Sequence, residues 1–139
     1  MPPRAKGPAK AQPASRPAPR PERVAAYRTG LGAEDRAAEF FTTMGFDILA
    51  RRFRAPGGEI DLIARRDTLL VFVEVKARRK LDAAAWSITP RNRLRVVQAA
   101  EIWLAQNPQD HVEDMRFDAV LISPTGRTLH LPGAFEVET

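Results

Sequence analysis

Two neighbouring β-rich runs around a short polar turn place the strongest constraint on how this chain can fold. The runs cover residues 59–64 and 69–76, and the residues between them, 66–68, are typical of a tight turn. A β-hairpin is therefore expected. If its turn centres on 67–68, position 61 pairs with 74 and position 59 with 76, and directly opposed residues have Cβ atoms roughly 4.5–5.5 Å apart.

Each run carries a charged pair within otherwise apolar sequence. Because side chains alternate along a strand, Glu59 and Asp61 share one face, as do Glu74 and Lys76. In the expected register the carboxylates of Asp61 and Glu74 oppose each other, where like charges repel. Oxygen ligands from two carboxylates are those that Mg²⁺ prefers, so a divalent cation would relieve the repulsion. Lys76 could then activate the attacking water or stabilise a phosphate, which suits metal-assisted phosphodiester hydrolysis.

Hydrophobic periodicity and turn residues predict the other elements. Gly45 is expected to end a first helix, and Thr89 followed by Pro90 is a strong signal for the start of a second. The order of helix, three strands, helix and two strands favours an α/β domain with a mixed sheet flanked by helices. The remaining predicted elements are helices over 33–44 and 90–106 and strands over 46–53, 115–123 and 127–131.

The excess positive charge of the chain is confined to its first residues. The 139 residues carry a net charge of +5, and residues 1–24 hold six basic residues, one acid and seven of the twelve prolines. Such a segment cannot bury enough apolar surface to offset its ordering entropy. We therefore expect a disordered basic tail over 1–24 and a folded domain over 25–139. The tail would serve either as a solubilising leader or as a salt-sensitive attraction for phosphate backbones.

The composition excludes several classes of site. Without cysteine, neither disulfides nor cysteine-ligated metals can form, and a reducing, cytoplasmic location is expected. The longest apolar run has five residues, so no membrane span is expected. No serine stands in a Gly-x-Ser-x-Gly elbow. His111 and His130 fit no metal-ligand spacing, and surface or edge-strand positions are expected for them.

The residues around the predicted hairpin resemble a known group of proteins. Asp61, separated by twelve residues from Glu74-Val75-Lys76, matches the D…ExK signature of the restriction-endonuclease-like, or PD-(D/E)xK, superfamily. The longer likeness extends over 28–136 and looks like the YraN family, which is similar to archaeal Holliday junction resolvases. The segments that carry it are Ala33-Glu34-Asp35, Gly45 to Leu49, Gly58 to Ile63, Val71 to Lys76, Arg116-Phe117-Asp118 and Ala134-Phe135.

The resemblance implies a restriction-endonuclease-like fold and a DNA nuclease that depends on Mg²⁺ or Mn²⁺. It makes Asp61 and Glu74 the metal-binding catalytic carboxylates and Lys76 the catalytic lysine. Glu34 on the first helix and the carbonyl of Val75 would complete the metal ligands. The role of Glu59 stays open between a ligand and a structural ion pair, for which Lys76 is one partner.

A basic stretch follows the proposed site. Between residues 76 and 95, seven basic residues stand against one acid. They could position a phosphate backbone across the metal, and no spacing among them indicates the reading of base sequence. The alternative is an exposed loop and helix kept soluble by arginines. The candidate nucleic-acid contacts are Arg78, Arg79, Lys80, Arg91 and Arg93.

Two other functions are compatible with the same residues, because function resides in a completed site and not in a fold. One is a non-catalytic nucleic-acid-binding module. The other is a structural partner in a DNA repair or recombination complex. A resolvase that acts on symmetric junctions needs two active sites, so that subclass predicts a homodimer.

Overall fold

The computed structural model describes residues 31–135, so the predicted tail over 1–24 lies outside the described residues. The predicted order of helix, three strands, helix and two strands is confirmed. A short 3₁₀ helix that the sequence did not predict precedes the second long helix. The elements are α2 (Leu31–Thr43), β1 (Asp47–Ala55), β2 (Gly58–Arg66), β3 (Leu69–Ala77), the 3₁₀ helix η2 (Ala83–Ala85), α3 (Pro90–Gln106), β4 (Asp114–Ile122) and β5 (Thr128–Phe135).

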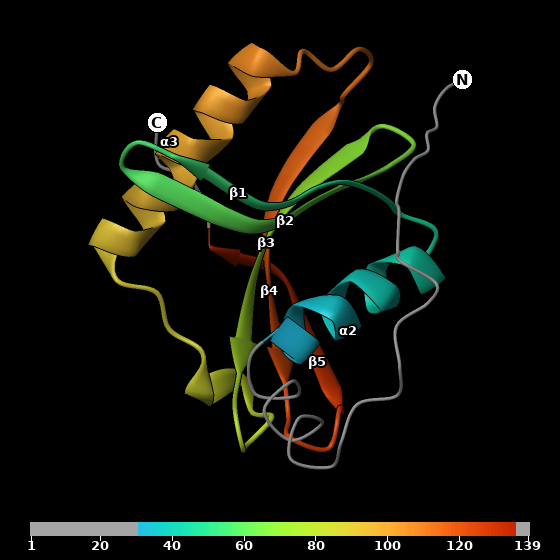
Figure 1. Cartoon of the computed structure of the whole chain (residues 1–139), viewed down its shortest axis with the longest axis vertical. Helices are drawn as coiled ribbons and strands as arrows, with labels where there is room; N and C mark the ends of the chain where they lie inside the picture. The colour runs from blue at the N-terminus through green and yellow to red at the C-terminus, as the bar shows by residue number, and fades with distance from the viewer. Residues whose placement is uncertain (1–30, 136–139) are drawn as a thin grey trace.

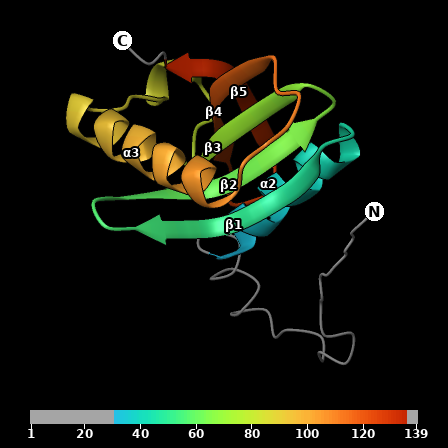
Figure 2. The same ribbon diagram turned by 90° about the horizontal axis from the view of Figure 1, so that it is seen from above.

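The five strands form one mixed sheet in the order β1-β2-β3-β4-β5 (Figure 1). β3 and β4 run parallel, whereas the other neighbouring pairs are antiparallel. Parallel neighbours need a long crossover connection, and α3 lies within it. Figure 2 shows α2 and α3 on opposite faces of the sheet. The predicted α/β class, a mixed sheet flanked by helices, is confirmed.

Each helix closes a separate apolar core against one face of the sheet. α2 packs Ala37 and Phe41 against the face of β3 that carries Val73. α3 packs Trp103 against the opposite face, where its ring lies edge-on to Phe72. Because β3 is buried from both sides, its sequence is a continuous apolar run up to the charged residues at its end.

The hairpin of β2 and β3 has the register that the sequence predicted. The paired residues run from Arg66 opposite Leu69 to Leu62 opposite Val73. Beyond Leu62 the pairing with β3 stops, and β2 continues with β1 as its only partner among the described strands. Figure 1 shows the β1–β2 hairpin crossing over β3. The expected pairings of 61 with 74 and of 59 with 76 are therefore both wrong, although position 61 still lies next to position 74 where the strands separate.

A left-handed residue bends β1 at this separation. Arg52 has a φ of 54°, which is uncommon for a residue with a side chain. The residues on either side of it pair with Leu62 and Ile60, so Arg52 stands opposite Asp61. Arg52 thus lies level with the point where β2 and β3 separate.

Gly58 allows the start of β2 to lie directly against α3. A Cβ atom at this position would be 2.0 Å from the carbonyl oxygen of Arg95 and 3.2 Å from the side chain of Ala99. No side chain fits in that space, so the close approach requires glycine. The contact ties the turn before β2 to the second turn of α3.

The start of α3 has the predicted cap. Oγ1 of Thr89 accepts a hydrogen bond of 3.1 Å from the backbone N–H of Asn92, and Pro90 is the first helical residue. Within the described part of the chain, neither long helix has the length and apolar character needed to cross a membrane.

Candidate active site

Asp61 lies where β2 separates from β3, and the backbone of β3 holds its side chain. The N–H of Val75 donates a hydrogen bond of 2.7 Å to Oδ2 of Asp61, beyond the last paired residues of the two strands. This bond directs the carboxylate towards β3. Glu74 immediately precedes Val75, so the structure brings the two predicted carboxylates together.

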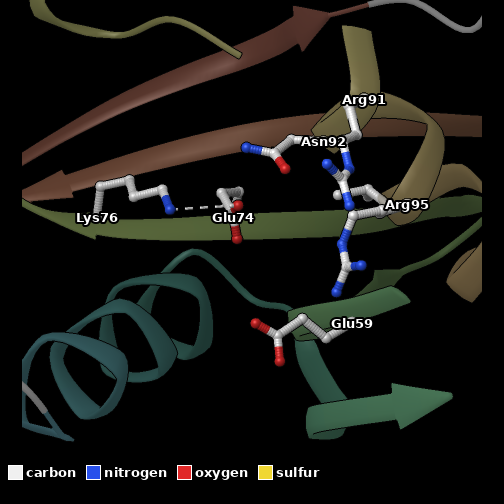
Figure 3. A pocket seen from close by; sticks show the side chains of 7 residues that line it. Glu59, Glu74, Lys76, Arg91, Asn92 and Arg95 are labelled. Carbon is white, nitrogen blue, oxygen red and sulfur yellow. Dashed lines mark ion pairs between the residues drawn. The ribbon is translucent and has the colours of Figure 1, made fainter. Parts of the chain in front are cut away.

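Glu74 is mostly buried on β3, with 17% of its side chain exposed. Burial has the largest effect on the pKa of its carboxyl group, followed by a side-chain hydrogen bond with Asp61 and the negative charge of Asp61. Together they raise the pKa of Glu74 to about 8. Nζ of Lys76 lies 3.6 Å from Oε2 of Glu74 and acts in the opposite direction (Figure 3). One ammonium group therefore does not compensate the two carboxylates.

Glu34 lies in the first turn of α2 and comes close enough to Asp61 to be affected by its charge. Burial, and then Asp61, raise the pKa of Glu34, whereas Arg52 and Arg51 lower it. Nε of Arg52 is 3.5 Å from Oε1 of Glu34. The third predicted carboxylate thus belongs to the same neighbourhood, but its partner in this conformation is an arginine.

The donor set at this position fits a hard divalent cation. Mg²⁺ is usually held by one or two carboxylates, and water or substrate phosphate supplies its other ligands. Asp61 and Glu74 offer such a pair, and burial together with the neighbouring Asp61 disfavours a second negative charge at Glu74 and raises its pKa. Across residues 31–135, no three acidic or histidine side chains converge into a ready metal cluster. Glu34, the third predicted ligand, lies beside Arg52 instead.

A cavity of about 420 Å³ opens beside Glu74 on the face of the sheet that α3 covers. Figure 3 shows Glu74 and Lys76 on β3, Glu59 on β2, and the basic side chains reaching in from α3. Carboxylates and guanidinium groups therefore face the same space. The lining residues are Glu59, Glu74, Lys76, Arg91, Asn92, Arg95 and Val96.

The predicted basic contacts occupy three different places. Arg91 lines the cavity. Arg93 lies on the same helix but directs its guanidinium over the ring of Phe135, 6.0 Å from the ring centre. The other three are exposed on the segment that follows β3, and these residues are Arg78, Arg79 and Lys80.

Arg95 belongs to the basic stretch noted in the sequence but not to its five candidate contacts, and it lines the cavity together with Arg91. The two arginines are four residues apart, and this helical spacing places them on one face of α3. Periodicity applied to the basic residues, rather than to apolar ones alone, would have separated Arg91 and Arg95 from Arg93.

Glu59 has a different ion-pair partner from the one suggested by the sequence. Its Oε1 lies 3.4 Å from Nε of Arg54, whereas Lys76 pairs with Glu74. The reason is the separation of β2 from β3, because Glu59 and Lys76 are no longer on paired strands while Glu59 remains opposite Arg54 on β1. Glu59 also reaches the cavity.

A second acidic centre, which the sequence did not predict, lies inside the sheet at Asp118. Its side chain is fully buried and accepts hydrogen bonds from Arg116, from the backbone of Gly133, and through a 2.7 Å contact with Nε2 of His130. Burial alone would raise the pKa of Asp118, but these bonds outweigh it, so the pKa is lowered. His130 does lie on edge strand β5, as expected, and His111 is exposed.

Sequence comparison places the chain among related bacterial proteins. A UPF0102 protein of Rhodopseudomonas palustris (strain BisB18) is 55% identical over 131 residues, which cover 92% of this chain and 97% of that protein. The protein BRADO0179 of Bradyrhizobium sp. (strain ORS 278) is 56% identical over 117 residues, covering 84% of this chain and 82% of that protein. The sequence model of uncharacterised protein family UPF0102 matches residues 33–122, which include every carboxylate of the candidate site, and the chain accordingly belongs to that family.

Proposed function

We propose that this protein is a divalent-cation-dependent nuclease that hydrolyses phosphodiester bonds in DNA and that its fold is of the restriction-endonuclease-like type. One observation carries the proposal: Asp61, Glu74 and Lys76 lie close together, and Glu74 and Lys76 line a cavity that arginines of α3 also line. Phosphodiester hydrolysis requires a cation site, a group that stabilises developing charge, and donors for the phosphate. Glu74, Lys76 and the arginines line the cavity, and Asp61 adjoins Glu74 without lining it.

Asp61 and Glu74 would hold Mg²⁺ or Mn²⁺, and Glu34 and the carbonyl of Val75 are the proposed additional ligands. A cation bound there would polarise the phosphate and favour deprotonation of the attacking water. The hydrogen bond from the N–H of Val75 fixes Oδ2 of Asp61, and the side-chain hydrogen bond between Asp61 and Glu74 would give way when a cation binds. Glu74 must give up its proton to bind, because its pKa of about 8 leaves it largely protonated at neutral pH.

Lys76 places its ammonium group beside Glu74, at the edge of the cavity. From this position it can orient the attacking water or stabilise negative charge that develops on the phosphate. Such stabilisation by a pre-positioned cationic donor is a major contribution to catalysis in a partly enclosed site. Its ammonium group, 3.6 Å from Oε2 of Glu74, lies in place before substrate arrives, and the two groups become a full ion pair once Glu74 has lost its proton.

The residues of α3 that line the cavity are evidence for a nucleic-acid substrate. Arg91, Asn92 and Arg95 present donors towards the carboxylates of Glu59 and Glu74 (Figure 3). Among the described residues, neither Arg91 nor Arg95 forms an ion pair. Guanidinium groups match phosphate geometry, so this wall would bind the DNA backbone without selecting a base.

A second group of basic residues follows β3. Arg78, Arg79 and Lys80 begin two residues after Lys76 and lie open to solvent. They would contact phosphates on either side of the scissile bond. Recognition through phosphates favours shape as the basis of selectivity, and branched DNA is the proposed substrate. If that branch is a symmetric junction, a homodimer would supply its two active sites.

The test is cleavage of labelled duplex, single-stranded and four-way DNA in Mg²⁺ or Mn²⁺. Glu74→Gln and Lys76→Gln are expected to lower the rate at least about a hundredfold, because each removes a group from the proposed reaction. Glu101→Gln is the matched control, since Glu101 is exposed on α3 and does not line the cavity. It should retain the wild-type rate.

The outcomes distinguish the competing functions. Cleavage that persists in both Glu74→Gln and Lys76→Gln would identify a contaminating nuclease and contradict the proposal. Tight, salt-dependent DNA binding without cleavage in any tested metal would favour a non-catalytic binding module. Absence of both would leave a structural role in a larger complex as the better explanation.

A further inference from the structure

Arg52 has an unusual backbone for its position. Among residues 31–135, three non-glycine residues have positive φ, and Asp67 and His111 are both in turns between elements. Arg52 is the member of this group that lies inside a strand, with a φ of 54°. L-residues avoid this region, so the surrounding structure must hold Arg52 there.

In the left-handed conformation, the two consecutive arginines Arg51 and Arg52 both form ion pairs with α2. In a regular strand, neighbouring side chains point to opposite faces of the sheet. Here Arg51 pairs with Asp35 and Arg52 pairs with Glu34, and both acids belong to the first turns of α2. The bend in β1 therefore turns Arg52 towards the helix that carries the third proposed cation ligand.

Glu34 lies under the influence of two opposed charges. The carboxylate of Asp61 acts on it from one side and the guanidinium of Arg52 from the other, with Nε of Arg52 3.5 Å away. Arg52 also stands opposite Asp61 in the strand pairing. A cation held by Asp61 and Glu74 could take Glu34 as a further ligand, and the guanidinium of Arg52 already lies beside that carboxylate.

We propose that Arg52 is a positioning residue that holds Glu34 beside the site in the cation-free protein and releases it when a divalent cation binds at Asp61 and Glu74. The inference rests on the proposed function, because it treats these carboxylates as cation ligands. Arg52 and the cation compete for one carboxylate. Arg52 thus keeps the acidic groups together without a metal and lowers the affinity for the metal.

The test measures cation binding without DNA, by electron paramagnetic resonance of free Mn²⁺ and by calorimetry with Mg²⁺. Arg52→Asn should tighten Mn²⁺ binding about fivefold, which corresponds to the upper range for a partly exposed ion pair. Asparagine tolerates the left-handed conformation, so this variant should fold. Arg52→Gly is a second variant with the same expected gain and no conformational restriction.

Two controls separate the proposed role from a general change in charge. Arg52→Lys keeps the positive charge and should bind Mn²⁺ within about twofold of the wild type. Arg54→Asn makes the same charge change on the same strand, but Arg54 pairs with Glu59 and not with Glu34. It should leave the affinity unchanged within the same range.

A double-mutant cycle tests whether Arg52 acts through Glu34. Glu34→Gln should weaken Mn²⁺ binding and abolish the gain produced by Arg52→Asn. A gain that survives in the Glu34→Gln background, or an Arg52→Asn affinity that is unchanged or weaker, overturns the inference. If wild type and Arg52→Asn both fail to bind Mn²⁺ and Mg²⁺, the proposed nuclease function fails as well. If wild type binds and Arg52→Asn is unchanged, only the role of Arg52 fails.

Discussion

The carboxylate of Asp61 accepts a 2.7 Å hydrogen bond from the backbone N–H of Val75, just beyond the last paired residues of β2 and β3. A side chain thus occupies the place that a neighbouring strand would fill. In the separated part of β2, Gly58 lies against α3, and Glu34 of α2 is close enough to Asp61 to be affected by its charge. The site depends on this separation, because the carboxylates lie within it.

Asp61 has a structural and a chemical role that substitution can separate. Asp61→Asn keeps an oxygen that accepts the bond from Val75, so stability should change little while cation binding and cleavage are lost. Asp61→Ala removes the acceptor as well and should lower the free energy of unfolding by about 1–3 kcal/mol. Urea denaturation and Mn²⁺ binding, measured on both variants, check this. Equal stability of the two variants would contradict the structural role of the bond.

The raised pKa of Glu74 predicts how stability depends on pH. The folded cation-free protein keeps the proton of Glu74 up to about pH 8, whereas the unfolded chain loses it near 4.5. The associated stability is therefore fully present below pH 4.5 and is lost as pH rises through about 8. Glu74→Gln cannot lose a proton and should lack this decline. Urea denaturation from pH 5 to pH 9 in the presence of a chelator, compared between the two proteins, measures it.

Gly58 should be required both for stability and for the shape of the cavity. Gly58→Ala places a Cβ 2.0 Å from the carbonyl oxygen of Arg95, and we expect a loss of about 1–3 kcal/mol with a shift of α3. Gly133→Ala is a control for loss of stability without a steric contact. Its positive φ strains any L side chain, but no atom lies within 4 Å of the added Cβ. Only Gly58→Ala should also weaken DNA binding. Thermal unfolding and fluorescence anisotropy measure the two effects, and an unshifted melting temperature for Gly58→Ala would count against the contact.

Asp118 should contribute to stability through its charge. Its lowered pKa means that this contribution is present above its ordinary value of 3.8 and is lost as pH falls through the lower folded value. Asp118→Asn should reduce the free energy of unfolding by about 3 kcal/mol at pH 6, because Arg116 and His130 lose a buried charged partner. The difference from wild type should shrink towards pH 2.5. A difference that does not depend on pH would show that shape, not charge, is the source.

The two faces of α3 should differ in their contribution to DNA binding. Arg91→Gln and Arg95→Gln each remove a donor from the cavity and should lower the slope of log affinity against log salt by about 1. Arg93→Gln has the same charge change on the face over Phe135 and should have a smaller effect. Fluorescence anisotropy at several salt concentrations, with a chelator to prevent cleavage, measures this. Equal losses for all three would indicate a general charge effect instead of a specific wall.

Local sequence was sufficient for the elements and for the central hairpin. The alternation of charged and apolar residues around Asp61 and Glu74 extends over only a few residues, and so does the capping of α3 by Thr89. Both could therefore be predicted from residues that are close in the sequence. The register of β2 and β3 followed from the turn at 67–68. The proximity of the two carboxylates was therefore predictable before any tertiary contact was known.

Contacts between residues distant in the chain decided the partners of these charges. Whether Glu59 meets Arg54 or Lys76 depends on where β2 leaves β3, and Arg52 with its positive φ and Gly58 with its close approach to α3 both lie in the separated part. The periodicity of apolar and charged residues describes a single helix or strand and does not predict the angle between two of them. The sequence by itself thus determined which acids stand together, whereas the packing of α3 against the sheet determined which basic groups face them.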